Sequence, residues 1–244
     1  MNLVTDVGNS FVKLAVFEGE RLLHLEKTTH ENFLQGVEKL FLEYPDIHQS
    51  IVSSVGRLDQ KDLLALKVFS PVHELTSSSR VPFVNDYKTP ATLGVDRMAL
   101  VTAAYSGYPK QNCLVIDAGS CITYDLLKAD GHYLGGAISP GLEMRFKALN
   151  HFTEKLPYVE GREYDDLIGS STETSIISGV VHGMVNEIDG IIAAYSKNFK
   201  DLTVILTGGD CLFLSKRLKS TIFAHSNFLL EGLNYILELN KHND

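Results

Sequence analysis

Two short segments of this chain carry an aspartate and a glycine in the same turn-like pattern. Residues 6–10 read Asp-Val-Gly-Asn-Ser, and residues 117–120 read Asp-Ala-Gly-Ser. Glycine lets a backbone turn approach a ligand closely, and the N–H groups of such a turn can bind phosphate oxygens. Lys13 follows the first turn, where its ammonium group could reach a β- or γ-phosphate. One such aspartate alone would more simply cap its own backbone, but the pair favours a phosphate site.

The two turn aspartates, Asp6 and Asp117, also indicate which phosphate compound would bind. Two facing turns with one carboxylate each suit a nucleotide whose Mg²⁺ is held through carboxylates and water. The P-loop pattern, the protein-kinase glycine loop with His-Arg-Asp, and the Rossmann glycine pattern are all absent from the sequence. We therefore expect Asp6 and Asp117 to converge on one triphosphate in a less common nucleotide fold.

A third group, Asp96 with Arg97, lies at the start of a predicted helix. In phosphoryl transfer an aspartate can take the proton of the acceptor hydroxyl, and arginine can bind a carboxylate or phosphate through two hydrogen bonds. The alternative is an exposed pair at a helix end, where aspartate is favourable in any protein. Thr172, in the first turn of another predicted helix, likewise either binds an anion or caps the helix.

The elements that would position these residues form an internal repeat with an offset of 111 residues. After each Asp-x-Gly turn come two further β-like runs, which predicts an antiparallel meander of three strands in each half. Residues 49–56 resemble residues 202–209, as buried strands that open into small-residue turns. We therefore predict one α/β unit used twice, in halves 1–110 and 111–244, with helices over 92–105, 141–151, 171–199 and 227–239.

Composition excludes several classes of protein. Of 244 residues, 44% are hydrophobic and 21% charged, which is typical of a globular domain. The net charge of −8 argues against nucleic-acid binding. We expect no signal peptide, no membrane span and, from three cysteines without a paired motif, no disulfide framework. No metal-ligand spacing of histidines is present.

Residues 6–10, Gly94 to Arg97, residues 117–120 and Thr172-Glu173 together resemble the type III pantothenate kinase family. That family belongs to the superfamily of acetate kinases, sugar kinases, heat-shock ATPases and actin. The resemblance implies two duplicated ribonuclease H-like (actin-like ATPase) α/β domains, each a mixed five-stranded sheet with helices on both faces, and a cleft between them. It also implies phosphorylation of pantothenate with Mg²⁺-ATP, the first step of coenzyme A biosynthesis, by a cytoplasmic homodimer.

The resemblance further implies a role for each matching residue. Asp96 would be the base that activates the hydroxyl of pantothenate, Asp117 would bind K⁺ or NH₄⁺, and Asp6 would hold Mg²⁺ through water. The residues implied in ATP binding are Asp6, Val7, Gly8, Asn9, Ser10, Phe11, Val12, Lys13 and Ser120. The residues implied in pantothenate binding are Tyr87, Gly94, Val95, Asp96, Arg97 and Thr172.

Ser10 and Ser120 stand where threonine is more usual in the family, and Cys121 stands where a small residue is usual. None of these departures removes a chemical group that the activity needs. Three alternatives stay open: a sugar-type kinase of the same superfamily, an actin-like filament subunit, and a nucleotide-dependent regulator without kinase activity.

Overall fold

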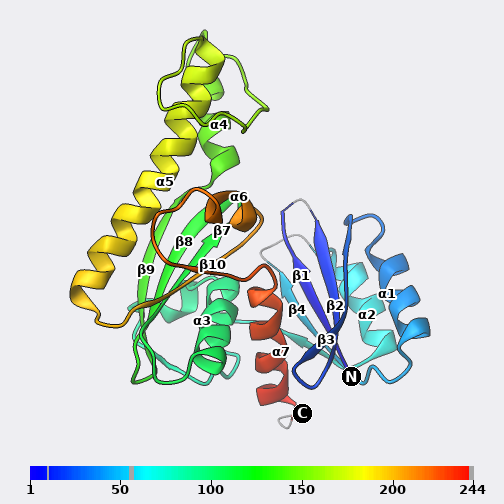
Figure 1. Ribbon diagram of the computed structural model, residues 1–244. Coiled ribbons are helices and arrows are strands. Elements are labelled where there is room, and N and C mark those ends of the chain that lie inside the picture. Colours follow the sequence, from blue (N-terminus) through cyan, green and yellow to red (C-terminus); the bar gives the residue numbers. More distant parts are fainter. Residues whose placement is uncertain (10, 55–57, 242–244) are drawn as a thin grey trace. The chain divides into compact units, whose positions relative to one another are not determined.

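The computed structural model describes residues 1–9, 11–54 and 58–241 (Figure 1). The chain forms two compact units. The first contains Met1–Pro109, Gly131–Tyr133 and Asn227–Asp244, and the second contains Lys110–Asp130 and Leu134–Ser226. The C-terminal helix is thus grouped with the first unit, whereas the predicted halves, 1–110 and 111–244, follow the duplicated sequence. Those halves stay a proposal.

The first unit is built on a five-stranded mixed sheet with the order β3-β2-β1-β4-β5. Its strands are β1 Asn2–Val7, β2 Val12–Glu18, β3 Arg21–Thr28, β4 Gln49–Ser54 and β5 Val72–Glu74. The first three strands form the predicted antiparallel meander, and β4 and β5 run parallel to β1. All six residues of β1 are buried, because helices cover both faces of the sheet.

Helices α1 and α2 cover one face of this sheet, and α3 and α7 cover the other (Figure 1). They span α1 Phe33–Glu43, α2 Gln60–Phe69, α3 Val95–Gly107 and α7 Phe228–Asn240. Successive side chains of a strand point to opposite faces. Leu3 and Val7 therefore pack with α1 and α2, whereas Val4 packs with α3 and α7. Asp6 shares the face of Val4 and so faces α3.

The sheet of the second unit repeats this topology. Its order is β11-β10-β7-β8-β9, followed by β6 (Val84–Asn85). The strands are β7 Cys113–Ala118, β8 Cys121–Leu127, β9 His132–Pro140, β10 Thr203–Thr207 and β11 Phe223–Ala224. β7 pairs antiparallel with β8 and parallel with β10, as β1 does with β2 and β4. The duplication is confirmed, but this sheet has one strand more than the predicted five, because β6 pairs with the start of β9.

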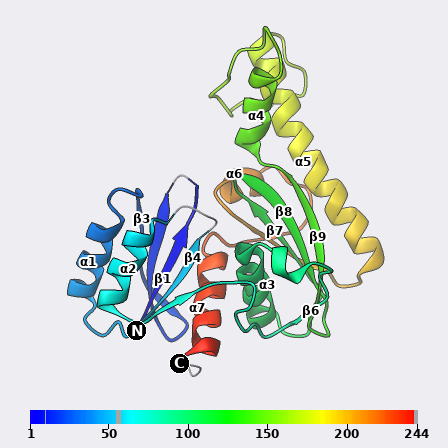
Figure 2. The ribbon, with the colours of Figure 1, turned by 180° about the vertical axis from the view of Figure 1, so that it is seen from behind.

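The helices of the second unit are α4 Leu142–His151, α5 Thr172–Asn198 and the short α6 Cys211–Ser215. In Figure 2, α4 and the first turns of α5 extend past the ends of strands β7 to β9. Ser171 caps the start of α5 and forms a capping box with Thr174. By length and composition α5 could cross a membrane, yet half of its most apolar window is buried inside the protein. Its apolar residues form part of the core.

Candidate functional site

A row of three polar side chains crosses the first sheet at the end of β1. Asp6 pairs in register with Lys13 on β2 and with Ser53 on β4, so all three lie on the face that α3 covers. Lys13 Nζ lies 3.9 Å from Asp6 Oδ2. Ser53 is completely buried, and its hydroxyl has no hydrogen-bond partner among the described residues. A buried hydroxyl of this kind requires an explanation such as a bound ligand, ion or water.

Asp6 is a perturbed carboxyl group. Only 9% of the residue is exposed, and burial raises its pKa above the ordinary value of 3.8. The ammonium group of Lys13 lowers the pKa, and the carboxylate of Asp96 raises it again. Asp96 therefore lies close enough to Asp6 for the two charges to interact, as the sequence interpretation of a common site required. Buried carboxyl groups with a perturbed pKa, such as Asp6, are frequent at functional sites.

The turn after β1 has the close backbone approach that was predicted. The N–H of Gly8 donates to the carbonyl of Phe11 at 3.1 Å, and a Cβ on Gly8 would lie only 3.2 Å from that oxygen. The ring Nε2 of His30 lies 3.1 Å from the carbonyl oxygen of Gly8, which holds the turn in place. Asn9 and Phe11 are exposed. Ser10, also predicted to contact ATP, lies outside the described residues.

Gly94 precedes α3 and makes room for the carboxylate of Asp96. Asp96 Oδ1 accepts a hydrogen bond from the backbone N–H of Arg97 at 2.8 Å. A Cβ on Gly94 would lie 2.4 Å from this same oxygen, so a larger residue would displace the carboxylate. The carboxylate also lies in the first turn of α3, where the helix dipole stabilises negative charge.

Arg97 is buried, with its guanidinium carbon 5.5 Å from the centre of the Tyr87 ring. Tyr87 stacks in turn on Tyr133, and its N–H donates to the side chain of Asn85. The predicted pantothenate contacts Tyr87, Gly94, Val95, Asp96 and Arg97 are therefore brought together in one unit. A guanidinium group held against an aromatic ring is well placed to bind a carboxylate.

In the second unit, Asp117 lies at the end of β7, paired with Thr123 on β8 and Thr207 on β10. Gly208, at φ +95°, passes directly beside it. A Cβ on Gly208 would lie 2.4 Å from Asp117 Oδ1 and 2.5 Å from the carbonyl oxygen of Ala118. Thr123 is only 9% exposed, and its hydroxyl has no hydrogen-bond partner in the part of the chain that the structure describes.

Ser120 is exposed in the turn between β7 and β8, where the N–H of Gly119 donates to the carbonyl of Cys121 at 3.0 Å. The carbonyl of Ser120 accepts a hydrogen bond from Gly141 N–H at 3.2 Å. This turn matches the Gly8 turn of the first unit, as the repeat predicted. It leaves the side chain of Ser120 accessible to a ligand.

Thr172 is the first residue of α5 and lines a groove of about 1200 Å³ between α4 and α5. The helix itself is capped by Ser171, so Thr172 does not serve as the cap. Apolar side chains, among them Phe152 and Ile176, line the same groove. Thr172 is thus part of an open surface of the second unit.

Sequence reasoning missed three residues of these sites: His30, Ser53 and Thr123. Ser53 and Thr123 could have been found by counting, because each lies on a strand predicted to neighbour a turn aspartate. The register that sets them beside Asp6 and Asp117 is a property of strand pairing. His30 carries no comparable signal in the sequence, since it comes from the loop between β3 and α1.

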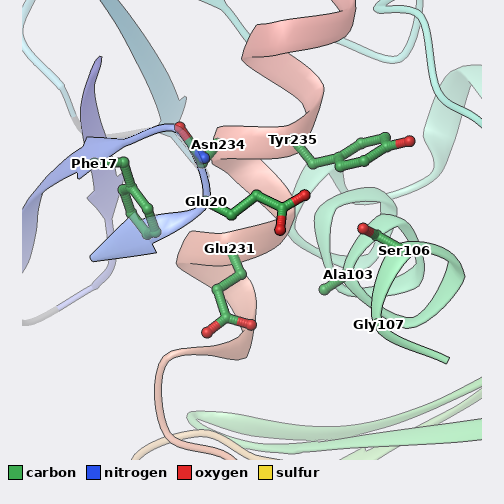
Figure 3. A pocket seen from close by; sticks show the side chains of 8 residues that line it. All are labelled: Phe17, Glu20, Ala103, Ser106, Gly107, Glu231, Asn234 and Tyr235. Atoms are coloured by element: carbon green, nitrogen blue, oxygen red, sulfur yellow. The ribbon is translucent and has the colours of Figure 1, made fainter. Parts of the chain in front are cut away.

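A separate pocket of about 300 Å³ lies in the first unit, between the β2–β3 hairpin, the end of α3 and α7 (Figure 3). It contains the carboxylates of Glu20 and Glu231, and none of the described residues that line it was predicted as a site residue. Over the described residues, no group of three or more histidine, cysteine, aspartate or glutamate side chains forms a metal cluster.

Comparison with known proteins shows the family to which this chain belongs. Residues 2–194 match the family model described as type III pantothenate kinase. A type III pantothenate kinase of Christiangramia forsetii is 53% identical over 99% of both chains. Among solved structures, a candidate Baf-family transcriptional activator from Campylobacter jejuni is similar over 98% of both chains, with a TM-score of 0.62 and 23% identity. A candidate N-acetylmannosamine kinase from Listeria monocytogenes is similar over 99% of both chains, with a TM-score of 0.55 and 12% identity. Both structures support the two-domain actin-like fold.

Proposed function

Because this chain belongs to the type III pantothenate kinase family, we propose that Asp96 is the general base of its phosphoryl transfer from ATP to pantothenate. The activity itself follows from the family: the chain phosphorylates pantothenate in coenzyme A biosynthesis. The observation that carries the proposal is the carboxylate of Asp96 at the start of α3, close enough to Asp6 to raise the pKa of that group.

Asp96 is suited to the role because its position is fixed. Phosphoryl transfer depends mainly on positioning and charge stabilisation, with a carboxylate that accepts the proton of the attacking hydroxyl. The N–H of Arg97 holds one carboxylate oxygen, and Gly94 leaves room for it. In the proposed reaction the primary hydroxyl of pantothenate gives its proton to Asp96 as its oxygen bonds to the γ-phosphorus, and ADP leaves.

Arg97 and Tyr87 are proposed to hold pantothenate in the orientation that this proton transfer needs. Pantothenate carries a carboxylate, which is the partner a guanidinium group binds best. The guanidinium carbon of Arg97 lies 5.5 Å from the centre of the Tyr87 ring, so the two side chains lie together. Gly94 and Val95 contribute backbone to the same site, and Thr172 contributes a hydroxyl from the groove of the second unit.

ATP is proposed to contact the turns of both units through residues Asp6 to Lys13 and through Ser120. Phosphate oxygens would bind the turn N–H groups and the ammonium group of Lys13. A divalent cation is proposed to bind beside Asp6, where the carboxylate lies next to the buried hydroxyl of Ser53. When bound, Mg²⁺ or a similar ion neutralises charge on the phosphates.

K⁺ or NH₄⁺ is proposed to bind at Asp117. The backbone of Gly208 passes close to Asp117 Oδ1 and to the Ala118 carbonyl, so the carboxylate and a carbonyl oxygen lie together there. These oxygens are ligands that alkali cations prefer. When bound, the ion would supply positive charge beside Asp117. We further propose that the enzyme acts in the cytoplasm, without nucleic acid or membrane partners, in keeping with its net charge of −8.

The assignment is tested by measuring ADP release with Mg²⁺-ATP and pantothenate, with glucose or no acceptor as controls. We expect release only with pantothenate. Asp96→Asn should lower kcat by about 10²–10⁴-fold, the usual size of general-base catalysis, while nucleotide binding is retained. Asp62→Asn, in the first turn of α2, is the matched control and should change neither. Equal release with all three acceptors, or loss of nucleotide binding in Asp96→Asn, would refute the assignment.

A further inference from the structure

The two turn aspartates differ in the side chain that lies across the strand pair from them. Asp6 pairs in register with Lys13, and Asp117 pairs in register with Thr123. The two positions are equivalent, because β1 with β2 and β7 with β8 occupy the same places in the two sheets. Directly opposed residues on one face are the closest cross-strand neighbours. The duplicated fold thus offers a carboxylate–lysine pair in one unit and a carboxylate–threonine pair in the other.

In the first unit this pair is an ion pair. Lys13 Nζ lies 3.9 Å from Asp6 Oδ2, so a covalently attached ammonium group lies beside the carboxylate. In the second unit the equivalent side chain is an uncharged threonine. Instead Thr123 brings a hydroxyl that is 9% exposed and has no hydrogen-bond partner in the described chain. A buried hydroxyl without a partner is costly unless a ligand binds it.

We propose that the monovalent cation at Asp117 occupies the place that the ammonium group of Lys13 has in the first unit, with the Thr123 hydroxyl as one of its ligands. The inference rests on the proposed cation site at Asp117. It adds Thr123 to the ligands of that site. It also relates the site to the duplication: a diffusible cation beside Asp117 takes the place of the lysine side chain beside Asp6.

The ligand set is chemically consistent with this replacement. Hydroxyl, carboxylate and backbone carbonyl oxygens suit K⁺, and NH₄⁺ can donate hydrogen bonds to the same atoms. The lysine ammonium group is a compact point charge, which makes it the side-chain counterpart of NH₄⁺. On the side of β10, Gly208 packs closely against Asp117, because a Cβ there would lie 2.4 Å from Asp117 Oδ1. Thr123 and Gly208 therefore border Asp117 from two neighbouring strand ends.

Three substitutions of Thr123 test the inference. Thr123→Lys restores the arrangement of the first unit and should give turnover that is the same, within about twofold, in KCl and in choline chloride. Thr123→Val keeps the shape and removes the oxygen, so the K⁺ concentration for half-maximal activity should rise roughly tenfold. Thr123→Ser keeps the hydroxyl and should respond to K⁺ like the wild type. Thr5→Val, which also removes a buried hydroxyl without a described partner, is the matched control and should be unchanged.

Binding is measured independently of activity, as the shift of the melting temperature between KCl and choline chloride at equal ionic strength without substrates. The wild type, Thr123→Ser and Thr5→Val should show the shift, whereas Thr123→Val and Thr123→Lys should lose it. If the wild type, Thr123→Val and Thr123→Lys all show the same shift with K⁺, the role of Thr123 is refuted. The proposed cation site at Asp117 would not be affected by that result. A wild type with no K⁺ response would also overturn the proposed cation site at Asp117.

Discussion

Asp6 lies where a carboxyl group is costly to keep ionised. Burial and the neighbouring Asp96 raise its pKa, and Lys13 only partly offsets them. A group whose pKa is higher in the folded state stabilises the fold fully at low pH. That contribution is lost as the pH rises through the folded-state pKa. Once ionised, Asp6 therefore serves ligand binding at the expense of stability.

Asp6→Asn should accordingly melt at a higher temperature than the wild type at neutral pH, while its affinity for Mg²⁺-ATP falls. The amide is neutral at every pH, so the difference in melting temperature should shrink as the pH approaches the ordinary aspartate value of 3.8. Thermal scans over this pH range, with nucleotide titrations, measure both effects. Asp166→Asn, at an exposed position, is the control. A lower melting temperature at neutral pH would mean that the ion pair with Lys13 outweighs the burial.

Ser53 is the second residue whose environment indicates function. Its hydroxyl is buried beside Asp6 without a described partner, whereas that of Thr5 is equally buried on the opposite face of the sheet, which α1 and α2 cover. Only Ser53 shares the face of Asp6, Lys13 and α3. The hydroxyls of Ser53 and Thr5 are thus equally buried, but they lie on opposite faces of the sheet.

Ser53→Ala should weaken binding of the divalent cation with ATP by roughly tenfold, the loss expected for one hydrogen bond near a charge. Its stability should stay the same or rise, because an unsatisfied buried hydroxyl is removed. Thr5→Val should show the same change in stability with unchanged Mg²⁺-ATP affinity. Mn²⁺ titration in the presence of ATP, together with thermal unfolding, separates the two effects. Equal affinity in both variants and the wild type would exclude Ser53 from the site.

At the scale of elements, the helix that carries Asp96 is held by the last helix of the chain. α7 packs against α3 at Gly232, where a Cβ would lie 1.9 Å from the carbonyl oxygen of Ala99. This contact is between backbones, so no flexible side chain can move aside. The position of Asp96 at one end of α3 therefore depends on a glycine far along the sequence.

Gly232→Ala should destabilise the protein by about 1–3 kcal/mol, the usual cost of overpacking, and lower kcat by displacing α3. Gly190→Ala is the matched control, because a Cβ at that position in α5 meets no described atom within 4 Å. The free energy of unfolding of Gly190→Ala should rise by about 0.5–1 kcal/mol, because alanine stabilises a helix more than glycine does. Denaturant unfolding measures the stability of the two variants, and steady-state kinetics measure their kcat. A stable, fully active Gly232→Ala would show that α7 does not position α3.

At the scale of the whole molecule, we propose that the enzyme is a homodimer that uses the surface around the groove of α4 and α5. Ile168 is 82% exposed there, and Phe152 in the same unit is 81% exposed. Apolar side chains gathered on an exposed surface commonly mark an interface. Light scattering should give twice the mass of one chain.

Ile168→Asp should shift the protein toward the monomer, because it places a charge in the proposed interface. Leu42→Asp is the matched control, since Leu42 on α1 is 84% exposed in the other unit. That variant should keep the mass of the wild type. A monomeric wild type would end the proposal, and a dimer unaffected by Ile168→Asp would place the interface elsewhere.

The duplicated architecture and most of the proposed site residues could be predicted from patterns in the sequence. The offset of 111 residues, the Asp-x-Gly turns and the helical spacing of α3, α4, α5 and α7 are local patterns. Strand alternation, turn chemistry and helix periodicity depend on residues that are close together in the sequence. The family resemblance, carried by the same motifs, also gave the activity that the comparisons support.

The neighbours of those motifs could not be predicted from the sequence, because they depend on how the chain folds. The pairing of Asp6 with Ser53 and of Asp117 with Thr123 depends on register, and the contact of Gly232 with α3 joins residues more than a hundred positions apart. The grouping of α7 with the first unit and the pairing of β6 with β9 are of the same kind. Such contacts arise because buried surfaces must pack against one another, and no local pattern records which surface will be the partner.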